Sequence, residues 1–365
     1  MSERRVTSQD VADLAGVSRT TVSFVMNNTQ QVVIRPETRQ KVLQAASQLG
    51  YEPNASARAL ASRRAKAIGL IMTRDPHYIS SDPFLPQILG GLLDPVKQAQ
   101  LNLLTEWVEP GKQPQIYRSL IRAKHIDGMI VMTPRFDDPG LKELEDSDIP
   151  TVLMGTVAGR QLYSVDVDNT ASARVAVSHL TSLGHRRIGC VLNAPLPYSS
   201  SSQRLEGYQL ALADAGIPWD PTLVRQGDFD LTSGYLRMGS LLAEHPEISA
   251  VFVASDQVAI GAMTAIREAG LSIPDDISVM GFDDIPTAAF TDPSLTTIRV
   301  PAREIAQKSC ELLLRLIQGE RPEPRAVTLP TEFILRQSTQ EAGRSTPSEK
   351  KIQNVSPLTI SPTVQ

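Results

Sequence analysis

The stretch that decides the N-terminal fold is Val6–Asn28, VTSQDVADLAGVSRTTVSFVMNN, which predicts two short helices joined by a tight turn. Thr7 is a suitable N-cap, because its hydroxyl can accept a hydrogen bond from a free backbone N–H of the first turn. Gly16 permits the turn, and Ser18 caps the second helix. The apolar stripes have helical spacing. They are Val11, Leu14 and Ala15 in the first helix, and Val22, Val25 and Met26 in the second.

The second helix of this pair has polar and aromatic residues between its apolar positions. They are Arg19, Thr20, Thr21, Ser23 and Phe24. Side chains of these types on an exposed helix can reach base edges or phosphates in a major groove of DNA. The pattern alone also fits an ordinary helical hairpin in an enzyme.

Charge distribution favours the DNA-binding alternative. Residues 1–66 contain ten basic and five acidic side chains, a net charge of +5, whereas the remainder of the chain carries −9. A basic head on an acidic body is what a protein needs when only its head meets a polyanion.

Two further segments follow in the N-terminal region. A third helix is predicted from Pro36, which suits a first turn, to Gly50, which ends it, with Val42, Ala45, Ala46 and Leu49 as its apolar face. Residues 54–61 consist of helix formers but have little apolar surface. A helix this short is marginal in water, so we expect it to fold only when it binds something.

From Ala67 onwards, short apolar runs alternate with longer helical patterns, which indicates βαβ units and parallel sheets. The expected strands are 67–72, 102–107, 128–132, 151–154, 188–192, 250–254 and 278–281, and the expected helices are 82–98, 115–124, 170–184, 203–216, 233–244, 257–270 and 301–318. These strands and helices are too many for a single sheet. We therefore expect two doubly wound α/β lobes that face each other across a cleft.

The expected fold class is thus an all-α helix-turn-helix head followed by an α/β core of two lobes. The boundaries are 1–52 for the head, 53–65 for a hinge helix and linker, 66–340 for the core and 341–365 for a disordered tail rich in Ser, Thr and Pro. Within the core, lobe one is expected over 66–165 and 294–322, and lobe two over 166–293 and 323–340.

Several classes of function find little support in the sequence. We see no apolar run long enough to span a membrane and no secretory signal, and the two cysteines, Cys190 and Cys310, suit buried thiols in a reducing cytoplasm. The serines of 199–202 lack the glycines of a nucleophile elbow, so we expect no catalytic residue. The five histidines have no metal-ligand spacing, and no phosphate or dinucleotide fingerprint is present, so neither a metal nor a cofactor is expected.

An ordered set of motifs resembles the LacI/GalR family of bacterial transcription regulators over residues 6–340. The head motif is DVADLAGVSRTTVS at 10–23. It is followed by YEPN at 51–54, LGHRRIG at 183–189, QRLEGY at 203–208, QGDF at 226–229, SDQVAIGAM at 255–263, DISVMGFDD at 276–284 and LTTIRV at 295–300. The resemblance implies a helix-turn-helix head, a minor-groove hinge helix, a periplasmic-binding-protein-like core, a homodimer and a small effector held between two lobes.

The resemblance also implies which residues contact DNA. Arg19 and Thr20 fall where family members read base edges, and Ser18, Thr21 and Ser23 where they contact the backbone. Phe24 is a departure, because an arginine that reads guanine commonly stands there. The remaining expected contacts are Thr7 and Asn27 in the head and Asn54, Ala57 and Leu60 in the hinge, where Leu60 corresponds to a leucine that intercalates at a base step.

For the effector, Arg204 corresponds to the family's arginine that holds ligand hydroxyls or a carboxylate. Phe229 corresponds to the aromatic residue that stacks on the ligand, and Asp283 to the carboxylate that anchors it. The other expected contacts are Phe84, Ser200, Ser255, which stands where an asparagine is usual, and Asp256. For Asp256 a helix N-cap is an equal alternative, and Phe84 also fits a core residue.

The sequence therefore predicts a cytoplasmic, homodimeric, non-enzymatic regulator that binds operator DNA. It is expected to repress a carbohydrate-use operon under control of a sugar or sugar phosphate. A purine or nucleoside effector is the main alternative, since a purine would also stack on Phe229. A transporter's solute-binding protein and an α/β enzyme are further alternatives from other classes.

Overall fold

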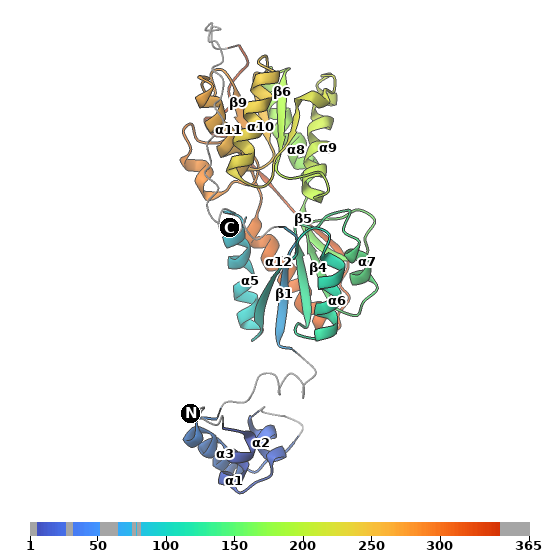
Figure 1. The fold of residues 1–365 in the computed structure, drawn as a ribbon, viewed down its shortest axis with the longest axis vertical. Coiled ribbons are helices and arrows are strands. Elements are labelled where there is room, and N and C mark those ends of the chain that lie inside the picture. The colour runs from blue at the N-terminus through green and yellow to red at the C-terminus, as the bar shows by residue number, and fades with distance from the viewer. Residues whose placement is uncertain (1–5, 27–31, 52–64, 75–77, 79–81, 344–365) are drawn as a thin grey trace. The chain divides into compact units, whose positions relative to one another are not determined.

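The structure is a computed structural model, and it describes residues 6–26, 32–51, 65–74, 78 and 82–343. The chain forms two compact units, residues 1–66 and residues 67–365. The described residues of the first unit form three helices, and the second unit contains two α/β lobes (Figure 1). The expected fold class, a helical head and an α/β core with parallel sheets, is confirmed.

The head consists of α1 (Ser8–Ala15), α2 (Arg19–Met26) and α3 (Pro36–Leu49). Thr7 caps α1 as predicted, in a capping box with Asp10. Gly16 ends α1 with a φ of 65°, a left-handed conformation that glycine adopts without steric cost. These local signals act over a few residues, which is why the sequence predicts the helices closely.

One apolar residue of α1 is not where the stripe predicted it to be. Leu14 is 48% exposed, whereas Val11 and Ala12 are buried and Ala15 packs against them. At 100° per residue, Val11, Ala15 and Ala12 cover one arc, and Leu14 lies about 100° from its centre. The buried face of α1 therefore includes Ala12 in place of Leu14.

Lobe one is built on a six-stranded parallel sheet of order β11-β5-β4-β3-β1-β2. Its strands are β1 (Ala67–Met72), β2 (Asn102–Trp107), β3 (Gly128–Met132), β4 (Thr151–Met154), β5 (Tyr163–Val167) and β11 (Ala326–Leu329). Helices α5 (Leu85–Gln98) and α12 (Ala302–Ile317) cover one face. Helices α6 (Gln113–Ala123) and α7 (Gly140–Glu145) cover the other (Figure 1).

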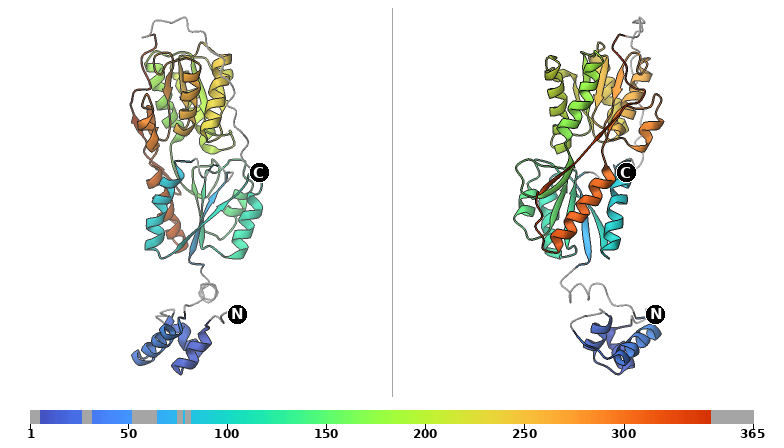
Figure 2. Two further views of the ribbon diagram at one scale, coloured as in Figure 1. Left: turned by 60° about the vertical axis from the view of Figure 1, so that its left-hand side comes forward. Right: turned by 180° about the vertical axis from the view of Figure 1, so that it is seen from behind.

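Lobe two is built on a four-stranded parallel sheet of order β7-β6-β8-β9. Its strands are β6 (Ile188–Leu192), β7 (Val224–Gln226), β8 (Ala250–Val253) and β9 (Ser278–Met280). Helices α8 (Asn169–Ser182) and α9 (Ser199–Asp214) pack as one pair, and α10 (Leu231–Glu244) and α11 (Asp256–Glu268) as another. The two pairs cover opposite faces of this sheet (Figures 1 and 2).

The described chain passes between the lobes three times: between β5 and α8, between β10 (Thr297–Arg299) and α12, and between β11 and β12 (Glu332–Ile334). Strands β10 and β12 pair with each other in antiparallel fashion. The long segments of the last two passages are visible from behind in Figure 2.

This topology corrects two of the expected lobe boundaries. Residues 323–329 were expected in lobe two, but β11 pairs in parallel with β5 at the edge of the lobe-one sheet. Residues 294–297 were expected in lobe one, but Leu295 is buried in the lobe-two core and the carbonyl of Thr296 accepts from Gly281. The residue at which the chain passes from one lobe to the other depends on which strand it can pair with. That partner lies far away in the sequence, so local sequence does not reveal it.

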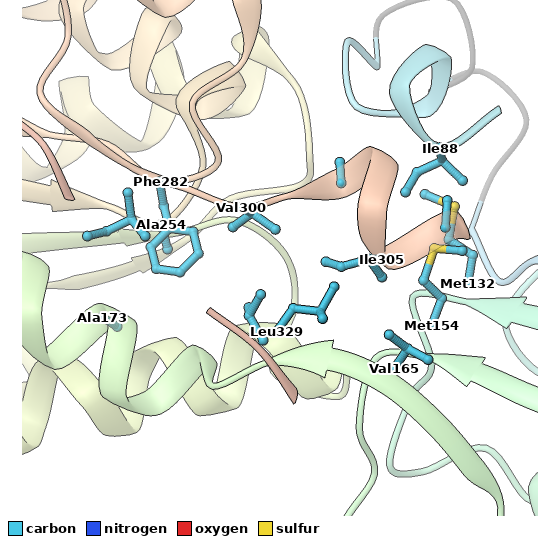
Figure 3. Packing of buried hydrophobic residues seen from close by; sticks show 14 of the residues in the cluster. Ile88, Met132, Met154, Val165, Ala173, Ala254, Phe282, Val300, Ile305 and Leu329 are labelled. Carbon is cyan, nitrogen blue, oxygen red and sulfur yellow. The ribbon is translucent and has the colours of Figure 1, made fainter. Parts of the chain in front are cut away.

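A continuous cluster of buried apolar side chains extends through both lobes (Figure 3). The labelled members include Ala254, Phe282 and Val300 on the lobe-two side and Met132, Met154 and Ile305 on the lobe-one side. Packing at native density makes such a core rigid, so the ends of its strands are held in defined positions.

Among the elements, the long apolar strands were predicted almost to the residue, whereas β5, β7, β10, β11, β12 and α7 were not expected. Strands β7, β10 and β12 have three residues each, and β5 carries the polar Ser164 and Asp166. Helix α9 begins at Ser199, not at Gln203, because the serine run forms its first turn, where serine is favoured. None of the helices in the described ranges combines the length and apolar composition that a membrane crossing requires.

Candidate functional site: a helix-turn-helix surface and an interlobe cleft

In the head, the residues expected to contact DNA lie at the surface. Arg19 and Thr20 are exposed, and Thr21, Ser23 and Phe24 are half-buried. Ser18 accepts a hydrogen bond from the backbone N–H of Thr21 at 3.1 Å, which orients the start of α2. The expected residues of α2 therefore form one accessible face, while Val22 and Val25 point into the head core.

Several of these residues already have partners within the head. Thr7 is exposed, and its hydroxyl donates to the Asp10 carboxylate at 2.7 Å. The Nε of Arg19 donates to the Ser8 hydroxyl at 3.0 Å. This bond joins the first residue of α2 to the first residue of α1. Four other expected contacts, Asn27, Asn54, Ala57 and Leu60, lie outside the described residues.

In the core, a cleft of about 90 Å³ opens between the two lobes. It is lined by six of the seven residues expected to bind an effector. They are Phe84 from lobe one and Ser200, Arg204, Phe229, Ser255 and Asp283 from lobe two. Phe84 also packs against the main core cluster, as its alternative as a core residue predicts, and its contact with an effector stays a prediction. Parallel sheets bind ligands at the carboxyl ends of their strands, which is where these residues lie.

Arg204, in the second turn of α9, is buried and held by three kinds of contact. Its Nε donates to Oδ1 of Asn169 at 3.0 Å, and its Nη1 donates to the Ala254 carbonyl at 2.6 Å. Its Nη1 also lies 3.3 Å from Oδ1 of Asp283, and its Cζ lies 3.9 Å from the centre of the Phe282 ring. The guanidinium is thus positioned before any ligand arrives, which lowers the entropic cost of binding.

Asp283 follows β9 in a left-handed backbone conformation, with a φ of 113°. Burial raises the pKa of Asp283 to about 6, although the Arg204 charge and the Ser255 hydroxyl favour the ionised form. Burial also disfavours the charged form of Arg204, which lowers the pKa of its guanidinium. The carboxylate therefore remains mostly charged at neutral pH but lies close to its titration range.

Phe229 presents an aromatic ring among side chains from both lobes. Tyr198 meets it edge-on at 4.9 Å between ring centres, and Tyr78 of lobe one lies 5.8 Å away. The Arg74 guanidinium of lobe one lies 5.1 Å from the centre of the Phe229 ring. Direct bonds also join the lobes here, since the Tyr198 hydroxyl donates to the Thr73 carbonyl at 2.9 Å. These contacts hold the lobes together at the cleft.

The seventh expected residue, Asp256, does not line the cleft. Its Oδ2 accepts from the Ile285 backbone N–H at 3.0 Å, and its Oδ1 accepts from the Thr297 hydroxyl at 2.7 Å. The side chain is completely buried, and burial raises its pKa well above the usual range. Asp256 therefore joins α11 to the loop after β9 and to β10, an arrangement that favours a structural role, and its expected ligand contact stays a prediction.

The sequence reasoning missed several residues that line the cleft, among them Arg74, Asp82, Thr133, Asn193 and Gln257. Thr133 and Asn193 directly follow β3 and β6. Their position immediately after a predicted parallel strand is a signal that could have found them. Arg74 and Asp82 form a buried ion pair with each other, which no local pattern indicates.

Among the described residues, no group of three or more His, Cys, Asp and Glu side chains could hold a metal ion. Cys190 and Cys310 are free and buried, and burial raises the pKa of both thiols. The cleft instead offers charge-assisted hydrogen bonds and an aromatic face, which are means of binding a small organic molecule.

Comparisons with known proteins agree with both parts of the structure. The family model described as "Bacterial regulatory proteins, lacI family" matches residues 7–54, and "Periplasmic binding protein-like domain" matches residues 177–339. The HTH-type transcriptional regulator CelR of Thermobifida fusca is 34% identical over 338 residues, which cover 92% of this chain and 98% of CelR.

Two solved structures are similar over 92% of this chain and the whole of their own. The complex of the transcriptional regulator CelR with cellobiose is 33% identical, with a TM-score of 0.71. The lac repressor dimer bound to operator and the anti-inducer ONPF is 31% identical, with a TM-score of 0.80. With a helix-turn-helix head, a two-lobed core and a relative of this identity along nearly its full length, the chain belongs to the LacI family of bacterial transcription regulators.

Proposed function

We propose that this protein represses genes for carbohydrate use and that a sugar bound in the interlobe cleft controls its affinity for operator DNA. The observation that supports this most strongly is the position of the Phe229 ring in the same cleft as the Arg204–Asp283 ion pair. A sugar requires an apolar surface for its C–H face and charged groups for its hydroxyls, and this cleft has both.

The chemistry of the ion pair suits hydroxyl groups. Arg204 carries several N–H donors and Asp283 is an acceptor, and hydrogen bonds to charged groups are the stronger kind. The similar regulator CelR was solved with cellobiose, which adds support for a carbohydrate. A purine could stack on Phe229 as well, so purines belong in the test.

For the control of DNA binding, we infer a change in how the lobes close. The Tyr198–Thr73 and Tyr78–Asp228 hydrogen bonds cross between the lobes, and a ligand in the cleft would contact both sides of this junction. In a homodimer, as the related lac repressor forms, closure would shift the two first lobes against each other and change the spacing of the two heads. Such a switch requires that the effector bind one arrangement better than the other.

The same proposal makes the protein a non-enzymatic, cytoplasmic regulator without a cofactor. Members of its family are DNA-binding regulators rather than enzymes. A bacterial transcription regulator meets its operator in the cytoplasm, where the chromosome lies.

Two measurements on the full-length protein test this function. The melting temperature of the protein is measured with cellobiose, glucose, ribose, glucose 6-phosphate and guanine. It should rise with a sugar, since a ligand that binds the native state stabilises that state by mass action. A gel shift with fragments of the source genome should find a preferred site, and the same sugar should change its occupancy.

The matched variants are Asp283→Ala in the cleft and Asp94→Ala on the surface of α5, where the carboxylate is 71% exposed. Asp283→Ala should bind the operator but lose the response to the sugar, whereas Asp94→Ala should behave as the parent. A response to guanine alone would identify a purine-controlled repressor, and absence of any preferred DNA site would exclude the proposed function.

A further inference from the structure

Asn193 is the first residue after β6 and lines the cleft, where it is 5% exposed. Its backbone carbonyl accepts from the Phe229 N–H at 2.7 Å, so it lies directly beside the aromatic residue of the cleft. Its carboxamide nitrogen donates to the Ser200 hydroxyl at 3.4 Å. The Ser200 bond therefore orients the side chain, and the Phe229 bond holds the backbone of Asn193.

The other end of this carboxamide, Oδ1, is buried and has no hydrogen-bond partner among the described residues. Buried polar groups in folded proteins nearly always have a partner, because desolvation without one is unfavourable. An unpaired acceptor in the wall of a binding cleft is most simply explained by a donor on the ligand.

The charges of the cleft restrict that ligand further. Two arginines line the cleft, and each has a carboxylate partner: Arg74 pairs with Asp82, and Arg204 pairs with Asp283. The charged residues of the lining therefore sum to zero. A phosphate or carboxylate group would have to displace one of these partners and face its negative charge.

At the start of α9, which borders the cleft at Ser200, the backbone donors on either side of Ser200 are engaged. The backbone N–H of Ser199 donates to the Pro134 carbonyl at 3.2 Å, and that of Ser201 donates to the Tyr198 carbonyl at 3.0 Å. These N–H groups are the usual anion ligands at a helix N-terminus, and here they have protein partners.

We propose that Asn193 is a specificity-determining residue whose free carboxamide oxygen accepts a hydrogen bond from a hydroxyl of an uncharged polyhydroxylated ligand. This rests on the proposed function, and it narrows the effector from a sugar or sugar phosphate to a sugar without a charged group. Ser200 engages the nitrogen end of the carboxamide, Phe229 fixes the backbone of Asn193, and the paired arginines disfavour anions.

The test uses isothermal titration calorimetry on the full-length protein with cellobiose, glucose, ribose and glucose 6-phosphate. The sugar that binds most tightly should be uncharged. Asn193→Leu should lower the affinity for this sugar by about tenfold or more, since one hydrogen bond is lost and an apolar group replaces the carboxamide. Asn193→Asp, which keeps an acceptor of the same shape, should retain more affinity than Asn193→Leu.

Melting temperature without ligand and operator binding serve as controls for folding, and both should remain close to those of the parent. Tighter binding of glucose 6-phosphate than of every uncharged sugar would overturn the inference. So would an Asn193→Leu variant that binds the sugar as the parent does, or an Asn193→Asp variant that binds as weakly as Asn193→Leu. These results leave the proposed function intact, whereas no change in operator occupancy with any sugar would refute the function and, with it, this inference.

Discussion

The guanidinium of Arg204 and the carboxylate of Asp283 lie 3.3 Å apart in the cleft, although 79 positions separate them in the sequence. Arg204 lies on a helix of lobe two, and Asp283 lies in the loop that follows the last strand of that lobe. Arg204 is also held by its hydrogen bonds to Asn169 and to the Ala254 carbonyl, so it keeps protein partners when Asp283 is replaced. The pair is therefore a rigid feature that a ligand meets already assembled.

The pKa of Asp283 predicts how effector binding depends on pH. Burial raises that pKa to about 6, so acidification below this value protonates the carboxyl and removes the charged acceptor. We expect the affinity for the sugar to fall by about tenfold between pH 7 and pH 5, because only the ionised fraction binds well. Calorimetric titration across this range measures it. An Asp283→Asn variant should bind more weakly and lose this pH dependence, and equal affinity of the parent at pH 5 and pH 7 would contradict the assignment.

Arg19 is expected to read a base rather than a phosphate. Arg19→Ala should cost about 1–3 kcal/mol on the preferred operator and relax the base preference at one position. Arg19→Lys is the matched control, because lysine keeps the charge but loses the forked donor geometry. Binding curves on the preferred site and on random DNA separate the two roles. If Arg19→Lys restores full discrimination, or if Arg19→Ala weakens both DNAs equally, Arg19 is a backbone contact.

Two adjacent glycines of α5 should respond in opposite ways to the same substitution. A Cβ at Gly91 would lie 2.2 Å from the Arg303 carbonyl oxygen on α12, whereas a Cβ at Gly90 would meet no atom within 4 Å. Gly91→Ala should therefore destabilise the core by about 1–3 kcal/mol through overpacking. Gly90→Ala should stabilise it by up to about 1 kcal/mol, since alanine favours a helix. Urea unfolding measures both, and equal midpoints for the two variants would show that α5 and α12 are not in such close contact.

Asp256 should contribute to stability and not directly to ligand binding. Asp256→Ala leaves the Ile285 N–H and the Thr297 hydroxyl without their acceptor, at a cost of about 1–3 kcal/mol for each unpaired group. Thr297→Val removes only one of these bonds and should cost less. Chemical unfolding of the two single variants and the double variant gives the coupling between these residues. A normally stable Asp256→Ala protein that no longer binds the sugar would instead identify a ligand contact.

The sequence by itself determined the features that depend on neighbouring residues. The caps at Thr7 and Ser18, the turn at Gly16 and the helix bounded by Pro36 and Gly50 all involve hydrogen bonds or dihedral angles within a few positions. The buried strands of the core were equally clear, because a strand covered on both faces is a continuous apolar run. The family resemblance then pointed to six of the residues that line the cleft.

Only the tertiary structure decided which polar groups share a site. Asp256 and Asp283 both follow strands of the same sheet. Asp256 nevertheless accepts hydrogen bonds from Ile285 and Thr297, whereas Asp283 faces Arg204 and the cleft. The Arg74–Asp82 pair and the free oxygen of Asn193 became visible in the same way. The physical reason is that partners of a buried polar group come from segments far apart in the chain, and their distances follow from packing of the two lobes rather than from any local pattern.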